Sequence, residues 1–173
     1  MQNLTIAVLG LGAMGLPMAT RLAEKYGVRG YDISGERLDL ARRAGIAPAN
    51  SARDAATGAH VVLLAVRNRV QLDDALYGDD GVVAVLTPGA VIVLTSTVGI
   101  DAVREVAAQL AEAELHLVDA PISGGPVRAG KGDLLVTVGA DDAAYDAALP
   151  VLEQLSSTLV RIGTKAGDVE LSV

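Results

Sequence analysis

The sequence predicts an α/β fold with a doubly wound parallel sheet and extra strands near its carboxyl end. Short apolar segments alternate along the chain with longer segments rich in Ala, Leu, Glu and Arg. The apolar segments are hydrophobic at every position, which is typical of strands covered on both faces. No repeat and no Ser/Pro linker divides the 173 residues, so one main domain is expected.

Seven apolar segments are the expected strands: 4–9, 28–31, 61–66, 91–94, 115–118, 134–138 and 158–162. The expected helices lie between them, at 14–25, 36–43, 70–76, 100–114 and 142–155. In such sheets the crossovers are right-handed and ligands bind beyond the carboxyl ends of the strands. The loops that follow the strands are therefore where functional residues are expected.

A glycine-rich turn, Gly10-Leu11-Gly12-Ala13-Met14-Gly15, follows the first strand directly and opens the first helix. Its first glycine allows a sharp turn, its second admits a pyrophosphate, and its third lets the helix pack on the strand. The free N–H groups at the start of the helix then face the anion. We predict a Rossmann dinucleotide-binding domain with these six residues at the cofactor; the alternative is a tight turn that merely requires glycine.

Asp32 ends the second strand 22 positions after Gly10 (32 − 10 = 22), near the spacing of about 20 expected for the acidic residue that binds the adenosine ribose. A carboxylate there favours NAD and repels the 2′-phosphate of NADP. The alternative role is an N-cap for the helix near Gly35, which Ser34 could serve as well. Arg29 and Arg37 are expected to lie near enough to soften the repulsion, and NAD is the predicted cofactor.

Composition argues against several other classes of function. The net charge is −7, the basic residues are scattered, and Phe and Trp are absent, which disfavours nucleic acid as a partner. The chain has no cysteine and only two histidines, which disfavours metal sites and Ser-His-Asp catalysis. The first apolar run ends at a glycine after six residues, too short for a signal or membrane segment, so a cytoplasmic location is expected.

Residues 10–19 closely resemble the N-terminal signature of the β-hydroxyacid dehydrogenase family, which includes 3-hydroxyisobutyrate dehydrogenases and tartronate semialdehyde reductases. A second match is Asp119-Ala120-Pro121-Ile122-Ser123-Gly124-Gly125, followed by Ala129, Gly130 and Gly132-Asp133-Leu134. It is similar to the family's substrate-binding segment and implies that Ser123, Gly124 and Gly125 bind a carboxylate. On the residues alone, a hydroxyl and two bare backbone N–H groups suit a carboxylate, and a plain Gly/Pro turn is the alternative.

The same resemblance implies two further cofactor contacts. Val66 and Arg67 occupy the place where the family touches the cofactor, although Leu-Pro is more usual there. Thr97, in Ser96-Thr97, resembles the family's residue beside the nicotinamide ribose. The alternatives are a solvated strand end for Arg67 and a helix N-cap for Thr97.

The resemblance implies an NAD(P)-dependent, reversible oxidation of a small 3-hydroxy acid to its semialdehyde. The family has a third motif, with spaced glycines and then a lysine that is the general acid/base, on the helix that leads into an all-helical second domain. The segment 163–168 resembles the opening of that motif, but 169–173 supplies no lysine. Lys165 lies before the last glycine of this segment, whereas the family's lysine follows the glycines. Lys131 is expected to be a solvated charge, so we assign no catalytic residue.

We therefore predict a dinucleotide-binding domain at 1–163 and the start of an interdomain segment at 164–173, without the all-helical domain. Loss of a positioned acid/base forfeits about 10²–10⁴ in rate, so the chain alone is expected to bind NAD and to catalyse poorly or not at all. The alternative is a noncatalytic NAD-binding module. The apolar run Leu159–Ile162 is expected to favour a homo-oligomer.

Overall fold

The computed structural model describes residues 3–169. Its strands are β1 (Thr5–Leu9), β2 (Gly27–Tyr31), β3 (Ala47–Pro48), β4 (Val61–Leu64), β5 (Val91–Leu94), β6 (His116–Asp119), β7 (Ile122–Ser123), β8 (Leu134–Gly139) and β9 (Ser156–Gly163). Its helices are α1 (Gly15–Ala23), α2 (Gly35–Arg43), α3 (Ala52–Ala56), α4 (Arg69–Tyr77), η1 (Val82–Ala84), α5 (Ile100–Glu112), α6 (Gly125–Gly130) and α7 (Asp142–Leu155).

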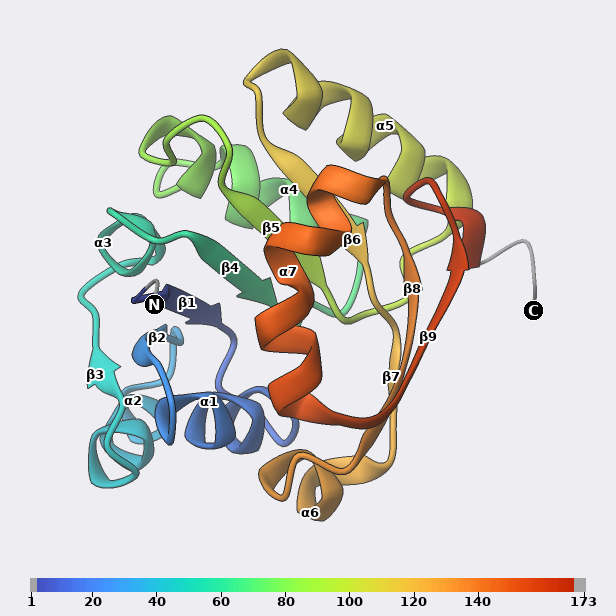
Figure 1. Cartoon of the computed structure of the whole chain (residues 1–173). Coiled ribbons are helices and arrows are strands. Elements are labelled where there is room, and N and C mark those ends of the chain that lie inside the picture. Colours follow the sequence, from blue (N-terminus) through green and yellow to red (C-terminus); the bar gives the residue numbers. More distant parts are fainter. Residues whose placement is uncertain (1–2, 170–173) are drawn as a thin grey trace.

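One nine-stranded sheet runs through the molecule in the order β3-β2-β1-β4-β5-β6-β8-β7, with β9 on the other side of β8 (Figure 1). The strands from β3 to β6 are parallel, as expected. β8 runs antiparallel to both β6 and β7, so β7 points the same way as β6. The strands β1, β2, β4, β5, β6 and β7 therefore all end at one side of the sheet, which we call the carboxyl-end edge.

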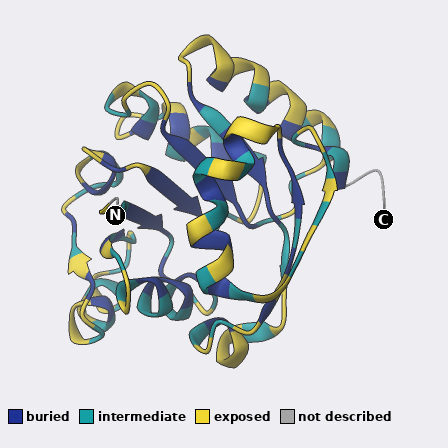
Figure 2. Ribbon diagram, viewed as in Figure 1, coloured by how far each residue is buried: buried dark blue, intermediate teal, exposed yellow. Residues whose placement is uncertain are grey.

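Helices cover both faces of the central strands, and the side chains of β1 show this directly. Ile6 and Val8 belong to a buried cluster with residues of α1 and α7, whereas Ala7 and Leu9 belong to a second cluster with residues of α4 and α5. Figure 2 shows the central strands as buried. Each large aliphatic side chain in these clusters stabilises the fold by about 1.5–3 kcal/mol, and the predicted doubly wound α/β fold is confirmed.

All seven expected strands and all five expected helices are present, with ends shifted by a few residues. The sequence analysis missed the short elements β3, α3, η1, β7 and α6. The predicted division of the chain at residue 163 stays a prediction. Residues 170–173 of the expected interdomain segment lie outside the described residues.

The last residue of α4, Tyr77, leads to a prediction about pH. Burial raises the pKa of the Tyr77 phenol, and the Glu112 and Asp73 carboxylates raise it further. The folded chain therefore holds this proton more tightly than the unfolded chain, whose tyrosines ionise near about 10. This part of the stability is complete below that pH and is lost as pH rises through the pKa of the folded state.

We expect the free energy of unfolding in urea to fall above about pH 10, and Tyr77→Phe to lessen that fall. An equal alkaline fall in wild type and Tyr77→Phe would contradict the prediction.

Candidate functional site

The turn between β1 and α1 lies at the carboxyl-end edge, and its backbone leaves no room for side chains at two positions. Gly10 has φ +95°, and a Cβ there would lie 2.8 Å from the carbonyl oxygen of Ala65. A Cβ on Gly15 would lie 1.8 Å from the carbonyl oxygen of Gly10. Since real Cβ contacts do not come so close, glycine at these two positions is required by the packing of α1 against β1 and β4.

Gly12 differs, because a Cβ there would meet no atom within 4 Å. Ala13 beside it is exposed, and Met14, the N-cap of α1, makes no side-chain capping hydrogen bond. The fold itself therefore does not require a glycine at position 12. The open space over Gly12 and the uncapped start of a nine-residue helix fit a pyrophosphate that approaches the backbone closely.

Asp32 is bound to the glycine-rich turn. Its Oδ2 accepts a hydrogen bond of 2.8 Å from the backbone N–H of Leu11, and its Oδ1 accepts one of 2.9 Å from that of Ser34. Ser34, and not Asp32, is the N-cap of α2. The carboxylate is only partly buried, so its remaining lone pairs can accept hydrogen bonds from the hydroxyls of a ribose.

The expectation that Arg29 softens the repulsion at Asp32 stays a prediction. Its guanidinium donates from Nη2 to the carbonyl oxygen of Thr57 at the end of α3, which holds it in place. Arg37 stands in the first turn of α2. The sequence analysis also missed Ile33, which is 94% exposed directly after Asp32 and offers an apolar surface beside its carboxylate.

The loops after β4 and β5 leave the sheet side by side, because Leu64 and Leu94 are register partners. Val66 is half-buried and Arg67 is exposed; both lie beyond the end of β4. Arg67 is fixed through its backbone, whose N–H donates to Gln71 Oε1 at 2.8 Å.

Thr97 lies in the loop after β5 and is exposed, while Ser96 is half-buried. The alternative role for Thr97 as a helix cap is wrong, because the N-cap of α5 is Gly99. The side chain of Thr97 therefore stands in the loop without a capping function.

The serine-glycine segment forms two short elements rather than a simple turn. Ser123 ends β7 at the carboxyl-end edge and is exposed, and Gly124 and Gly125 have φ of +140° and +81°. The six-residue α6 then packs against α1. The sequence analysis missed Arg128, whose stem lies against Gly124, with 3.2 Å between Arg128 Cδ and the position of a Cβ there.

The three lysines of the chain lie in different places. Lys165 lines a hollow of about 1060 Å³ beside α5, together with Arg104 and His116. Lys131 is the exposed C-cap of α6. Lys25 lines a second hollow at the opposite edge of the sheet from Ser123.

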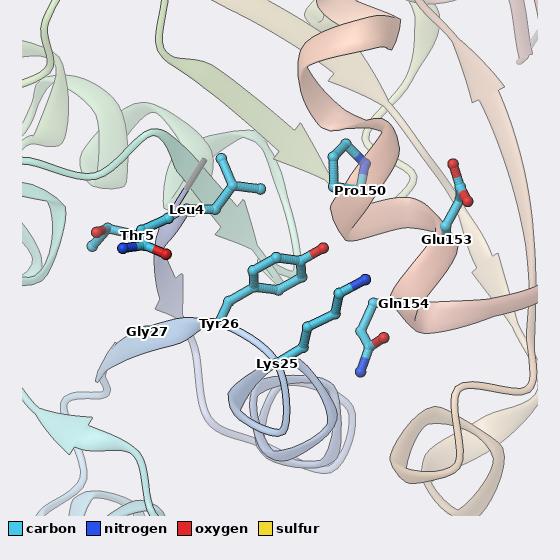
Figure 3. Close-up of a pocket in the computed structure, with 9 residues that line it drawn as sticks. Leu4, Thr5, Lys25, Tyr26, Gly27, Pro150, Glu153 and Gln154 are labelled. Atoms are coloured by element: carbon cyan, nitrogen blue, oxygen red, sulfur yellow. The ribbon is translucent and has the colours of Figure 1, made fainter. Parts of the chain in front are cut away.

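This second hollow, of about 1000 Å³, lies where β1 and β2 begin. Figure 3 shows Lys25 and Tyr26 extending from the turn after α1 toward Pro150 and Gln154 of α7. Neither hollow is lined by the glycine-rich turn, Asp32 or Ser123. The candidate site is therefore a set of loops along the carboxyl-end edge, separate from both hollows.

Residues 5–163 match the family described as the NAD binding domain of 6-phosphogluconate dehydrogenase. The chain belongs to this family. The match confirms the predicted NAD-binding domain, and its first residue is the first residue of β1.

Two relatives of this chain are dehydrogenases that are longer than it is. The chain is 36% identical to the L-threonate dehydrogenase of Pectobacterium atrosepticum over 94% of its own length and 54% of that enzyme. It is 35% identical to the NAD-dependent L-serine dehydrogenase of Pseudomonas aeruginosa over 91% of its own length and 53% of that enzyme. The chain thus spans about half the length of these relatives.

A solved structure shows the same fold. The 3-hydroxyisobutyrate dehydrogenase of Mycobacterium tuberculosis, solved with L-serine, superposes with a TM-score of 0.91 at 32% identity, covering 99% of this chain and 58% of that one.

Of the helices within residues 3–169, none combines the length and apolar character that a membrane span requires.

The different surroundings of Gly12 and Gly15 predict different effects of substitution. We expect Gly12→Val to change the free energy of unfolding by less than about 0.5 kcal/mol while it weakens NADH binding, because its side chain fills the space over the turn. Gly15→Ala is expected to destabilise the fold by about 1–3 kcal/mol or more. Urea unfolding and calorimetric NADH titration measure the two effects; a destabilised Gly12→Val, or a Gly15→Ala as stable as the wild type, would refute the assignment.

Proposed function

We propose that this chain supplies the cofactor-binding half of an NAD-dependent dehydrogenase that oxidises a small 3-hydroxy acid reversibly to its semialdehyde. The observation that carries the proposal is the bond between Asp32 and Leu11 N–H, which joins a ribose-binding carboxylate to a glycine-rich turn with open space over Gly12. L-Threonate and L-serine, named in the relatives, are both small hydroxy acids with a carboxylate, and this supports the substrate class.

The residues present fit NAD. The turn Gly10–Gly15 would bind the pyrophosphate through its backbone, and Asp32 would accept hydrogen bonds from the adenosine ribose. Ile33 would offer an apolar surface to the adenine, and Val66, Arg67 and Thr97 would border the rest of the cofactor from the loops after β4 and β5. When bound, NAD supplies the acceptor for the hydride that leaves the alcohol carbon.

The serine-glycine segment would hold the substrate by its carboxylate. The Ser123 hydroxyl is exposed, and the two glycines in left-handed conformation turn successive backbone N–H groups, which can form an anion-binding concavity. Because Ser123 and the glycine-rich turn lie at the same edge of the sheet, a bound carboxylate would hold the substrate on the cofactor side of the molecule.

We assign no residue to the proton that must leave the hydroxyl. Lys165, the lysine nearest the family's third motif, lines the hollow beside α5 with Arg104 and His116 and not the carboxyl-end edge. This placement favours the second candidate function, a noncatalytic NAD-binding module, for the chain by itself. A single experiment separates the two functions: slow NADH formation with L-serine or L-threonate supports the enzyme, and NADH binding without turnover supports the module.

Further properties of the chain belong to this proposal. The lack of a nucleic-acid partner is supported by the scattered basic residues and the net charge of −7, and a preference for NAD over NADP by the carboxylate of Asp32. A cytoplasmic location stays a prediction. Self-association through the last strand is likewise a proposal.

The role of Asp32 predicts how the two cofactors should compete. We expect Asp32→Asn to weaken NADH binding about 10-fold or more, because a charged hydrogen bond contributes about 1.5–3 kcal/mol. NADPH binding is expected to stay the same or strengthen, since the repulsion of its 2′-phosphate is removed. Calorimetric titration of both cofactors measures the change in preference.

Asp39→Asn is the matched control. Asp39 is an exposed carboxylate of α2 whose partner is Arg42 at 3.0 Å, so its loss is expected to leave both affinities as in the wild type. An Asp32→Asn variant that retains the full preference for NADH would contradict the proposal that Asp32 binds the adenosine ribose.

A further inference from the structure

The loops that follow β4 and β5 are linked to each other at the sheet. Thr95, the first residue after β5, is buried, and both its backbone N–H and its hydroxyl donate to the Leu64 carbonyl at the end of β4, at 3.1 Å and 3.0 Å. The β4 loop also lies against the glycine-rich turn, since a Cβ on Gly10 would lie 2.8 Å from the Ala65 carbonyl oxygen. The turn and the two loops therefore form a continuous row along the carboxyl-end edge.

A second link joins the helices into which the two loops lead. Arg69 is the first residue of α4, and its Nη1 donates to Glu105 Oε2 of α5 at 2.9 Å. Its Nε donates to both carboxylate oxygens of Asp73, at 2.9 Å and 3.0 Å, which holds the guanidinium in one orientation. Among the ion pairs within residues 3–169, only the pair of Arg69 and Glu105 joins α4 to α5.

The first turn of α4 in turn holds the β4 loop. Asn68, the N-cap of α4, accepts a hydrogen bond of 2.9 Å at its Oδ1 from Gln71 N–H. Gln71 Oε1 then accepts one of 2.8 Å from Arg67 N–H. These two bonds fix Arg67 to the same helical turn in which Arg69 lies, so a shift of Arg69 would also move Arg67.

Val66, Arg67 and Thr97 lie between the link at the sheet and the link at the helices. Thr97 stands two residues before Gly99, the N-cap of α5. The strand order is β2-β1-β4-β5, so a dinucleotide that begins at Asp32 and crosses the glycine-rich turn continues over these two loops. The separation of the loops therefore sets the space for the nicotinamide half of the cofactor.

The charges around Arg69 make its ion pair more than an ordinary surface pair. Exposed ion pairs usually contribute little, except where the geometry is good or several charges form a network. Here one guanidinium binds two carboxylates, and the Arg69 side chain is only 32% exposed. Without that cation the Asp73 and Glu105 carboxylates would repel each other, and this repulsion would act to separate α4 from α5.

We propose that Arg69 is a positioning residue for the nicotinamide half of the cofactor: by binding Glu105 it fixes the separation of the loops after β4 and β5. The inference rests on the proposed NAD-binding function. Arg69 acts through Arg67 and Thr97, whose loops border the cofactor, and not by contact with the cofactor itself.

Calorimetric titration with two ligands tests the proposal on the whole chain. ADP extends only over the glycine-rich turn and Asp32, whereas NADH also extends over the two loops. We expect Arg69→Met to weaken NADH binding about 3–10-fold and to leave ADP binding as in the wild type, which also shows that the variant folds. A residue with a merely structural role would change the two affinities alike.

Arg42→Met is the matched control. Arg42 pairs with Asp39 at 3.0 Å within α2, so its loss removes an exposed ion pair that joins no two elements, and both affinities are expected to stay as in the wild type. An Arg69→Met variant that binds NADH like the wild type, or that loses NADH and ADP equally, would overturn the inference and leave the proposed function standing. A wild type that binds neither ligand would overturn both.

A double-mutant cycle tests whether Arg69 acts through Glu105. Glu105→Gln keeps the length of the side chain and removes its charge, and we expect it to weaken NADH binding less than Arg69→Met does. Added to Arg69→Met, it is expected to cause no further loss, because the partner is already absent. Additive losses would show that the two residues act separately and would overturn the proposed link.

Discussion

The backbones of β1 and α1 approach each other closely at the glycine-rich turn, and this close contact fixes the neighbouring parts of the carboxyl-end edge. A Cβ on Gly15 would stand 1.8 Å from the carbonyl oxygen of Gly10, so the helix can start here only because Gly15 has none. The same turn is bound to β2, because Gly10 N–H donates to the Tyr31 carbonyl at 2.9 Å and Leu11 N–H donates to Asp32. β1, α1 and β2 therefore form one unit.

Side-chain packing carries this constraint into β2. Leu11 is fully buried, and a Cβ on Gly30 would lie only 3.2 Å from its two methyl groups. The buried side of the turn thus requires a small residue in the neighbouring strand, while Gly12 and Ala13 on the other side face open space. One short segment serves as core on one side and presents an open backbone surface on the other.

The strands and long helices could be predicted because their pattern is set by burial on both faces: Val61–Leu64 and Val91–Leu94 are fully buried. The short elements could not. Two-residue strands have no period, and α6 begins with Gly125-Pro126 and ends with Gly130, a composition typical of a turn. Its helical form depends on packing against α1, where Ala129 is buried and Gly130 lies beside Pro17. The antiparallel direction of β8 and the bond from Arg29 to Thr57 likewise depend on tertiary contacts that no local pattern contains.

The contact between α1 and α6 also explains how two motifs more than a hundred residues apart can serve one site. α1 begins at the glycine-rich turn, α6 begins at the serine-glycine segment, and the two helices pack together. α1 is further bound to α7 by reciprocal hydrogen bonds of 3.0 Å, from Arg21 Nε to the Gln154 carbonyl and from Gln154 Nε2 to the Arg21 carbonyl. A displacement of α1 would therefore move the glycine-rich turn and the serine-glycine segment together, so helix packing sets their separation.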